Sequence, residues 1–364
     1  MKFEPKLEES ILAFLHKTKI SRRDFLKGCS FLALSLGLDQ VEGIAKVALA
    51  IATKPRPPVI WLELQDCAGC SESLTRSQNP LLSQMVLNTI SLDYHETLMA
   101  PAGIQAEKSR QDTMRGYAGK YILVVEGSPS PKDDGIYCTI GGRSNMAILE
   151  EAAAGAAAVV AVGNCASFGG IPGASPAPTG GIGVRDALPG KAVINIAGCP
   201  PIAEAITNTF AYVLVYDRYP RLDELGRPMF IYGNTIHDRC IRRSFYDAGK
   251  YAMGFDDIKA REGYCLYMLG CKGPTTYNAC PTLRWNGGVS YPIQSGHPCL
   301  GCSEPHFWDR GSFYAGQSAP LASPSGTIAA IAVGAGAAVG AGSALLARAL
   351  SAKKEEKEEK TDGE

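Results

Sequence analysis

Residues 59–70 read Val-Ile-Trp-Leu-Glu-Leu-Gln-Asp-Cys-Ala-Gly-Cys, an apolar run that leads directly into two cysteines. A short apolar run such as 59–64 is typical of a strand that is covered on both faces of a parallel sheet. A Cys-x-x-Cys pair at the end of such a strand is more typical of a metal or redox site than of a structural disulfide. This stretch therefore predicts both the kind of sheet and the place on it where the chemistry lies.

Three more runs of the same kind follow in the first half of the chain. The predicted strands cover residues 59–64, 121–125, 157–162 and 192–197. Helical stretches at 145–154 and 202–216 lie between or after them, so the connections are long enough for right-handed crossovers. The sequence thus predicts an α/β fold with a mostly parallel sheet over residues 57–220.

Three of the predicted strands end in cysteines, namely Cys67 and Cys70, Cys165, and Cys199. The carboxyl ends of parallel strands share one edge of a sheet, where ligands bind, so these thiols can converge although they are distant in sequence. Four thiolates around one point suit a 4Fe-4S cluster or zinc. Two disulfides are an alternative in an exported protein, and a thioredoxin-type pair is another. The redox pair leaves Cys165 and Cys199 without a role.

The second half, residues 221–320, has little apolar periodicity and is dense in cysteine, glycine and aromatic residues. Its spacing gives one set of four candidate ligands and one set of three. These are His237, Cys240, Cys265 and Cys271, then Cys280, Cys299 and Cys302. A segment so poor in periodic apolar residues is expected to depend on bound cofactors for its fold, as small metal domains do.

The bulk composition restricts the function further. The chain has 364 residues, is 46% hydrophobic, and balances 36 basic against 36 acidic residues, so no global field favours nucleic acid. Twelve cysteines in so long a chain do not resemble a small disulfide scaffold. Residues 188–191, Leu-Pro-Gly-Lys, resemble a phosphate loop only in part, because Ala192 stands where Ser or Thr is needed, and they predict a turn.

The amino-terminal segment, residues 1–52, resembles a twin-arginine export signal. Arg22 and Arg23 precede a short apolar run at residues 28–38. Small residues at Ala48, Ala50 and Ala52 offer cleavage sites, among which the sequence does not choose. A basic turn before an ordinary amphipathic helix is the alternative interpretation. Cys29 lies in the apolar run and is excluded from the chemistry.

At the other end, residues 326–347 carry no charge over a length that could cross a bilayer as a helix. The segment is mostly Ala and Gly, so a flexible linker is the alternative. A transmembrane helix is the prediction, with residues 348–364 as a charged cytoplasmic tail. Together with the export signal, this predicts a cytoplasmic-membrane location, with the body on the periplasmic or outer face.

Several motifs together resemble the small subunit of nickel-iron hydrogenases, most closely the membrane-bound hydrogenase-2 type. The motifs are Cys67-Ala-Gly-Cys70-Ser-Glu-Ser, Gly163-Asn-Cys165-Ala-Ser-Phe-Gly-Gly, Gly198-Cys199-Pro-Pro, Leu269-Gly-Cys271-Lys-Gly-Pro-Thr and Gly296-His-Pro-Cys299-Leu-Gly-Cys302-Ser-Glu-Pro. The resemblance implies a flavodoxin-like sheet domain followed by a small, irregular, mostly helical iron-sulfur domain.

The resemblance also implies which residues bind which cofactor: two 4Fe-4S clusters and one 3Fe-4S cluster. The proximal 4Fe-4S cluster takes Cys67, Cys70, Cys165 and Cys199; the medial 3Fe-4S cluster takes Cys280, Cys299 and Cys302; the distal 4Fe-4S cluster takes His237, Cys240, Cys265 and Cys271. Pro292 matches the proline that replaces a fourth medial ligand. Gly69 and Gly170 stand where oxygen-tolerant relatives carry extra cysteines, so an ordinary proximal cluster is implied, and Cys138 has no assigned role.

The implied function is electron transfer in a hydrogen-oxidising, reversible enzyme, with no catalytic residue in this chain. The implied partners are a nickel-iron large subunit, possibly in a dimer of heterodimers, and a membrane-integral or ferredoxin-like electron-transfer subunit that exchanges electrons with quinone. Three alternatives remain. One is an iron-sulfur subunit of a quinone oxidoreductase related to complex I, and another is a disulfide-bonded, membrane-anchored binding protein. The third has the two Cys-x-x-Cys pairs, Cys67/Cys70 and Cys299/Cys302, hold nickel and iron in this chain.

Overall fold

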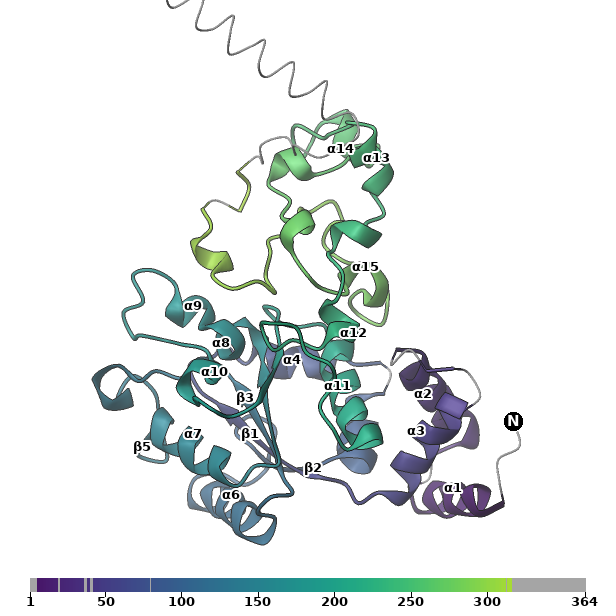
Figure 1. The fold of residues 1–364 in the computed structure, drawn as a ribbon, viewed down its shortest axis with the longest axis vertical. Helices are drawn as coiled ribbons and strands as arrows, with labels where there is room; N and C mark the ends of the chain where they lie inside the picture. Colours follow the sequence, from purple (N-terminus) through teal and green to yellow (C-terminus); the bar gives the residue numbers. More distant parts are fainter. Residues whose placement is uncertain are drawn as a thin grey trace, which may run out of the picture. The chain divides into compact units, whose positions relative to one another are not determined.

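The computed structural model describes residues 5–18, 20–35, 38–39, 42–78, 80–311 and 313–315 (Figure 1). All of the described residues belong to one compact unit. The fold of this unit is built around a parallel sheet.

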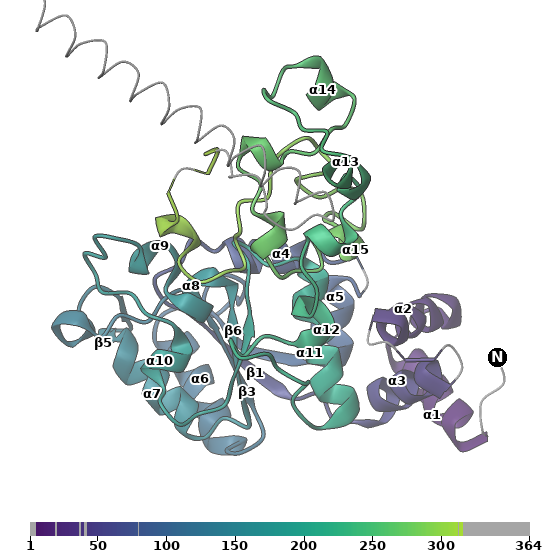
Figure 2. The same cartoon turned by 45° about the horizontal axis from the view of Figure 1, so that its top comes forward.

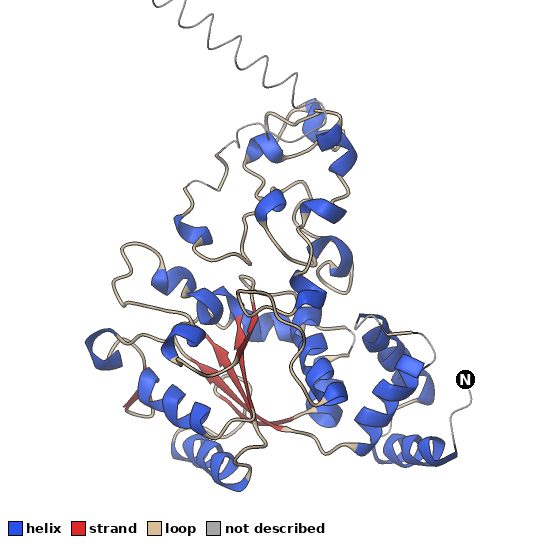
Figure 3. Cartoon of the chain, in the orientation of Figure 1, coloured by secondary structure: helices blue, strands red, loops and turns tan. Residues whose placement is uncertain are grey.

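The sheet has five parallel strands in the order β2-β1-β3-β6-β7 (Figure 3). The strands are β1 (Pro58–Glu63), β2 (Ser91–His95), β3 (Ile122–Glu126), β6 (Ala158–Val162) and β7 (Val193–Ile196). Numbered along the chain this is the order 2-1-3-4-5 of flavodoxin-like sheets. The predicted flavodoxin-like parallel sheet is therefore confirmed.

The four predicted strands are confirmed to within about one residue at most ends, and the helix predicted at 145–154 is α7 (Asn145–Ala154). The prediction missed β2, which pairs only with β1 at the edge of the sheet. Its first three residues, Ser91 to Asp93, are half-buried rather than buried. An edge strand alternates polar and apolar residues over a short length, so it lacks the continuous apolar run that marks the central strands.

Helices cover both faces of the sheet, and the pleat divides the core between them. They include α4 (Gly69–Thr75), α5 (Leu82–Gln84), the π-helix Met85–Thr89, α6 (Ile104–Gly116), α8 (Gly163–Phe168), α9 (Gly170–Gly173), α10 (Val184–Ala187) and α11 (Ala203–Tyr216). A 3₁₀ turn at Lys132–Gly135 and the short hairpin of β4 (Thr139–Ile140) and β5 (Arg143–Ser144) lie before α7. Ile60 and Leu123 belong to the core under α7, whereas Trp61 and Val124 belong to the core under α11. Alternate strand residues thus stabilise opposite faces.

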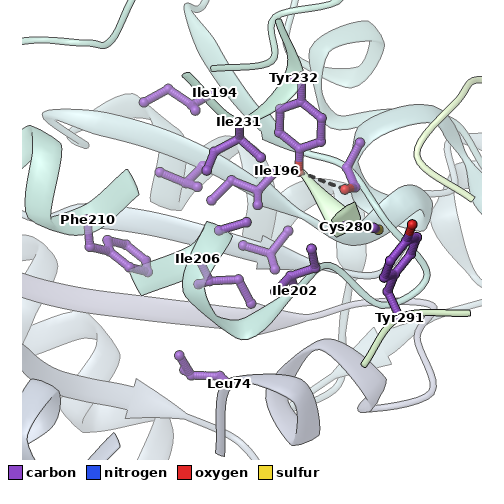
Figure 4. Close-up of a cluster of buried hydrophobic side chains, with 14 of the residues drawn as sticks. Leu74, Ile194, Ile196, Ile202, Ile206, Phe210, Ile231, Tyr232, Cys280 and Tyr291 are labelled. Atoms are coloured by element: carbon purple, nitrogen blue, oxygen red, sulfur yellow. Dashed lines mark hydrogen bonds between the residues drawn. The ribbon is translucent and has the colours of Figure 1, made fainter. Parts of the chain in front are cut away.

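The core under α11 continues into the second half of the chain. Figure 4 shows Ile206 and Phe210 of α11 in the same cluster as Tyr232, Cys280 and Tyr291. The hydroxyl of Tyr232 donates to the carbonyl oxygen of Ala197 at the end of β7, at 2.7 Å. The carboxyl edge of the sheet and the second half therefore share one apolar core.

The second half is irregular, as predicted, with helices of five residues or fewer. They are α12 (Met229–Tyr232), α13 (Arg243–Asp247), α14 (Ile258–Arg261), α15 (Cys280–Leu283) and 3₁₀ turns at His237–Arg239, Tyr267–Leu269, Gly273–Thr275 and Phe307–Asp309. Figures 1 and 2 show these elements beyond the carboxyl edge of the sheet. Asn164 of α8 crosses the boundary: its side-chain amide donates to the carbonyl oxygens of Cys302 and Glu304, both at 3.0 Å.

A buried arginine also joins the two halves. The Arg227 guanidinium forms ion pairs with Asp223 at 2.8 Å and with Glu304 at 3.0 Å. It lies over the rings of Tyr232 and Tyr277, 5.4 and 5.6 Å from their centroids. Arg227 is 3% exposed and Glu304 is 7% exposed. The charges of these two side chains are therefore held out of water, and each depends on the other for compensation.

The predicted signal segment folds as three helices on the body. They are α1 (Pro5–Thr18), α2 (Arg22–Ser35) and α3 (Glu42–Thr53). Their apolar faces form a core that includes Ala211 and Val215 of α11. Arg22, at the start of α2, pairs with Glu8 at 2.9 Å, and the candidate cleavage residues Ala48 and Ala50 are buried in this core.

The prediction of a C-terminal transmembrane helix needs correction. Among the described residues, none of the helices combines the length and the apolar character needed to cross a bilayer. Residues 326–347, on which that prediction fell, lie outside the described residues. Their sequence is mostly Ala and Gly, which contribute little apolar surface, so the lack of charge alone was a poor guide.

We expect Arg227→Met to lower the free energy of unfolding by about 3–5 kcal/mol, because it leaves the Glu304 carboxylate buried without its partner. The measurement is the urea midpoint of the purified protein. Arg143→Met is the matched control: its pair with Glu151 is about 40% exposed on both sides, and loss of such a pair costs at most about 1 kcal/mol. Equal losses in the two variants would contradict this account of Arg227.

Candidate functional site

The strand ends bring four predicted thiols together at the carboxyl edge of the sheet. Cys67 and Cys70 follow β1, Cys165 lies on α8 after β6, and Cys199 follows β7. Burial raises the pKa of the Cys70 thiol well above its usual value, and the thiolates of Cys165, Cys199 and Cys67 raise it further. These four sulfurs therefore lie within electrostatic reach of one another, as the sequence predicted.

Glycines let the backbone approach these sulfurs closely. A Cβ atom on Gly163 would lie 2.4 Å from the sulfur of Cys70, and one on Gly170 would lie 2.5 Å from the sulfur of Cys165. Gly163 also has φ +93°, a conformation that L side chains rarely adopt. The edge is therefore shaped so that no side chain at 163 or 170 competes with the sulfurs for space.

Glu126 is a residue at this edge that the sequence analysis missed. Its carboxylate accepts hydrogen bonds from the amide of Cys70 at 2.9 Å, from the amide and hydroxyl of Ser71, and from the indole of Trp61 at 3.1 Å. Glu126 is 1% exposed and ends β3, the one predicted strand without a cysteine after it. The signal was present: an acidic residue that closes an otherwise apolar strand indicates a polar partner at the same edge.

Glu126 also belongs to an acidic group. Glu63, Asp66 and Glu126 each place one oxygen within 4.8 Å of the others. Burial raises the pKa of Glu63 to about 7. Such groups are common without a metal ion, and this one already satisfies hydrogen-bond donors of the protein, so we assign no ion to it.

The thiols are arranged for a cluster rather than for a single ion or for disulfides. All twelve cysteines are free. A zinc ion would need sulfurs about 4 Å apart, because Zn–S bonds are about 2.3 Å long. Among the described residues, no three cysteine sulfurs lie within 4.8 Å of one another. Iron-sulfur clusters are held by cysteine thiolates, and the positive charge of iron would offset the burial that raises the thiol pKa values.

Cys280, Cys299 and Cys302 surround an apolar cavity of about 160 Å³ in the second half. Pro292, which the resemblance placed where a fourth ligand would stand, also lines this cavity. Burial raises the pKa of the Cys302 thiol. The structure thus brings the predicted set of three together with its proline.

His237, Cys240, Cys265 and Cys271 form the remaining set. The thiolates of Cys240 and Cys271 act on Cys265, whose pKa is raised to about 11, mainly by burial. The ring of His237 meets that of Tyr246 edge-on, with centroids 4.2 Å apart. Burial raises the pKa of Tyr246, and the Cys265 thiolate raises it further, so Tyr246 lies near Cys265. Because His237 contacts Tyr246, it also lies near the three thiols.

Backbone amides lie close to several cysteine sulfurs of the second half. The sulfur of Cys240 accepts a hydrogen bond from the amide of Arg242, two positions later in the chain, at 3.4 Å. Burial raises the thiol pKa of Cys265, Cys271 and Cys299, and in each the backbone of the residue two positions later lowers it in part. Hydrogen bonds of this kind favour the thiolate and raise the reduction potential of a cluster bound to it. The local chain conformation at each ligand is therefore suited to a bound anionic sulfur.

The set of three lies next to both of the other sets. Cys199, in the first set, lines the same cavity as Cys280, Cys299 and Cys302. The amide of Cys299, in the set of three, donates to the sulfur of Cys271, in the last set, at 3.4 Å.

The two remaining cysteines lie apart from these sets. Cys29 is buried between the amino-terminal helices, and burial raises its pKa to about 12. Cys138 is half-buried, and burial raises its pKa to about 11. Neither thiol is poised to react at neutral pH.

Two protein-family models match the chain, one on each half. The model described as "NADH ubiquinone oxidoreductase, 20 Kd subunit" matches residues 67–213. The model for the carboxyl-terminal part of the "NiFe/NiFeSe hydrogenase small subunit" matches residues 232–315. The second match covers the two candidate sets of the irregular half.

Curated relatives are similar over most of the chain. The hydrogenase-1 small chain of Citrobacter freundii is 50% identical over 84% of this chain and 82% of its own length. The uptake hydrogenase small subunit of Azotobacter vinelandii is 49% identical over 84% of this chain and 85% of its own. The hydrogenase-1 small chain of Escherichia coli K12 is also 49% identical, over 84% of this chain and 82% of its own.

Solved structures agree in fold. A chain of the [NiFeSe]-hydrogenase of Desulfomicrobium baculatum superposes with a TM-score of 0.68 at 33% identity, covering 72% of this chain and all of that one. A chain of the [NiFeSe] hydrogenase of Desulfovibrio vulgaris Hildenborough gives a TM-score of 0.66 at 38% identity, covering 72% of this chain and 99% of that one.

If the four thiols at the carboxyl edge hold iron, we expect Gly163→Ala to weaken its binding, because the new methyl group would occupy the position next to the sulfur of Cys70. The measurement is iron per chain in the purified protein, which should fall. Gly190→Ala is the matched control, since Gly190 has a similar φ of +84° but nothing within 4 Å of an added Cβ. Full iron content in Gly163→Ala would contradict the close approach.

Proposed function

Because the chain belongs to the nickel-iron hydrogenase small-subunit family, we propose that it binds three iron-sulfur clusters in a row and conducts electrons through them. The observation that carries the proposal is that the set of three adjoins both other sets: Cys199 lines its cavity, and the amide of Cys299 donates to the sulfur of Cys271. As a hydrogenase small subunit the chain pairs with a nickel-iron large subunit, which holds the hydrogen-activating site.

The ligand assignment follows the three sets. Cys67, Cys70, Cys165 and Cys199 take a proximal 4Fe-4S cluster; Cys280, Cys299 and Cys302 take a medial 3Fe-4S cluster; His237, Cys240, Cys265 and Cys271 take a distal 4Fe-4S cluster. Burial of the thiols, the absence of disulfides and the cavity beside Pro292 all support this assignment.

The residues of this chain perform three tasks in the proposed mechanism. When bound, iron-sulfur clusters supply centres that accept and release one electron with little change in geometry. The thiols fix the positions of these centres, and the backbone amides stabilise the extra negative charge on the sulfurs. Apolar residues such as Ile236 and Ile293 exclude water from the medial cavity, which keeps the electrostatic environment constant.

The exposure of the ligands suggests which end of the row of clusters faces the large subunit and which end faces the redox partner. Cys67 is the one exposed thiol among the eleven ligands, and it lies at the sheet edge, which suits a proximal site facing the large subunit. His237 is half-buried near the start of α13, which suits an exit toward a redox partner. A membrane-integral or ferredoxin-like subunit that exchanges electrons with quinone is the partner we propose there.

We also propose that the assembled enzyme works outside the cytoplasm. The support is the Arg22-Arg23 pair with its apolar run, which resembles a twin-arginine signal.

The alternatives account for fewer observations. A complex I-related subunit explains the match over residues 67–213 but leaves the sets at residues 237–302 without a role. A disulfide-bonded binding protein conflicts with twelve free thiols. Nickel and iron shared by the two Cys-x-x-Cys pairs would separate Cys67 and Cys70 from Cys165 and Cys199, with which they interact.

The proposed function is tested by iron and acid-labile sulfide analysis of the purified heterodimer, together with redox-titrated electron paramagnetic resonance. We expect one 3Fe-4S and two 4Fe-4S signals. Pro292→Cys should supply a fourth thiolate and abolish the 3Fe-4S signal of the oxidised protein, whereas Pro292→Ala should keep it. A colourless, iron-free protein would overturn the proposal.

We expect His237→Cys to lower the reduction potential of the distal cluster, because a thiolate replaces a neutral imidazole and adds negative charge. Hydrogen oxidation with an artificial acceptor should slow, while the medial signal keeps its potential. The measurement is the distal 4Fe-4S titration beside the steady-state rate. Unchanged rate and spectrum would show that the imidazole does not set this potential.

A further inference from the structure

Lys272 is a buried cation between two of the ligand sets. It follows Cys271 directly, and its side chain runs along Gly301, where an added Cβ would lie 3.5 Å from the Lys272 Cδ. The residue is 9% exposed. The ammonium has no hydrogen-bond acceptor among the residues that the structure describes, and it lies 5.5 Å from the centroid of the Phe313 ring.

The backbone of Lys272 is held independently of its side chain. Its amide donates to the carbonyl oxygen of Cys299 at 2.8 Å. Its own carbonyl oxygen accepts from the hydroxyl of Thr276 at 2.6 Å. A substitution of the side chain therefore leaves the peptide next to the medial ligand in place.

Lys272 lacks the polar partners that the other buried cations of this region have. Arg227 is balanced by Asp223 and Glu304, whereas Arg242 donates to the carbonyl oxygens of Ile293 and Tyr264. In the described part of the chain, Lys272 has no carboxylate within 4.0 Å. Burial lowers the pKa of the Lys272 ammonium and Arg310 lowers it further, whereas the Cys299 thiolate attracts the ammonium and raises this pKa.

We propose that the Lys272 ammonium acts on the medial cluster through its electric field and makes that cluster easier to reduce. The inference rests on the proposed function and adds a positioning residue to it. A reduced cluster carries one more negative charge, and a cation in a poorly polarisable interior stabilises this charge more strongly than one in water. The Phe313 ring holds the ammonium without cancelling its charge, since the face of an aromatic ring attracts cations but has no net charge.

The position of the medial cluster explains why its reduction potential matters. This cluster lies between the other two, so a medial reduction potential that is too low would slow electron transfer between them. A lysine beside Cys299 raises that potential from the side of the chain that also holds the distal ligand Cys271. The electric field of Lys272 acts on electron transfer between the medial and distal clusters. Lys272 does not need to touch the substrate or the redox partner for this.

The test is a redox titration of the medial 3Fe-4S signal in the intact heterodimer carrying Lys272→Met. We expect the ratio of oxidised to reduced medial cluster at a fixed potential to rise at least tenfold, which is about 59 mV toward lower potential for one electron. Lys272→Arg keeps the charge and should restore most of the wild-type value. Lys259→Met removes an exposed lysine from the same half and should shift little, because water and salt screen its charge.

The outcomes separate this inference from the proposed function. An unchanged medial potential in Lys272→Met, with the signal intact, overturns the inference. So does a loss of large-subunit binding without a change in potential, because the lysine would then pair with a carboxylate of that subunit. If Lys272→Met fails to hold the cluster, Lys272→Gln takes its place and must show the same shift. A wild-type heterodimer without a 3Fe-4S signal would instead overturn the proposed function.

Discussion

The burial of most of the cysteine thiols is the constraint on which the rest of this structure depends. Ten thiols and an imidazole must stay together without forming disulfides, and burial alone pushes the thiols toward their neutral form. Amides counter that tendency, because they favour the thiolate that iron requires. One such bond, from the amide of Cys299 to the sulfur of Cys271, crosses between two sets, and Cys199 lines the cavity of the set of three.

The sheet and the irregular half depend on this arrangement in different ways. The sheet is a complete apolar structure in which central strands are buried on both faces, so its edge can carry thiols without losing the fold. The second half has helices of five residues or fewer and joins the same core through Tyr232 and Tyr291. Arg227 and Asn164 hold the two halves together at the point where the first and second sets meet.

Buried charge has three distinct uses in this molecule. Arg227 and Glu304 neutralise each other and stabilise the junction between the halves. Glu126 collects donors from Cys70, Ser71 and Trp61, and so fixes the turn that carries the first Cys-x-x-Cys pair. Lys272 has neither kind of compensation in the described part of the chain, and its charge therefore acts on what lies beside it.

The sequence by itself determined the parallel sheet, its central strands and the division of the ligands into sets. Continuous apolar runs such as residues 122–125 and cysteines at fixed spacing are local properties, and the motifs around Cys271 and Cys299 lie in the part that matches the hydrogenase small-subunit model. It did not reveal β2, because a half-buried edge strand lacks that continuous run. The lack of charge at residues 326–347 led to the prediction of a transmembrane helix, although the segment has few large apolar residues. Only the tertiary structure decided the roles of Glu126, Arg227 and Lys272. The groups that surround each of these buried charges come from segments distant in the chain, so the local sequence does not show whether the charge is balanced.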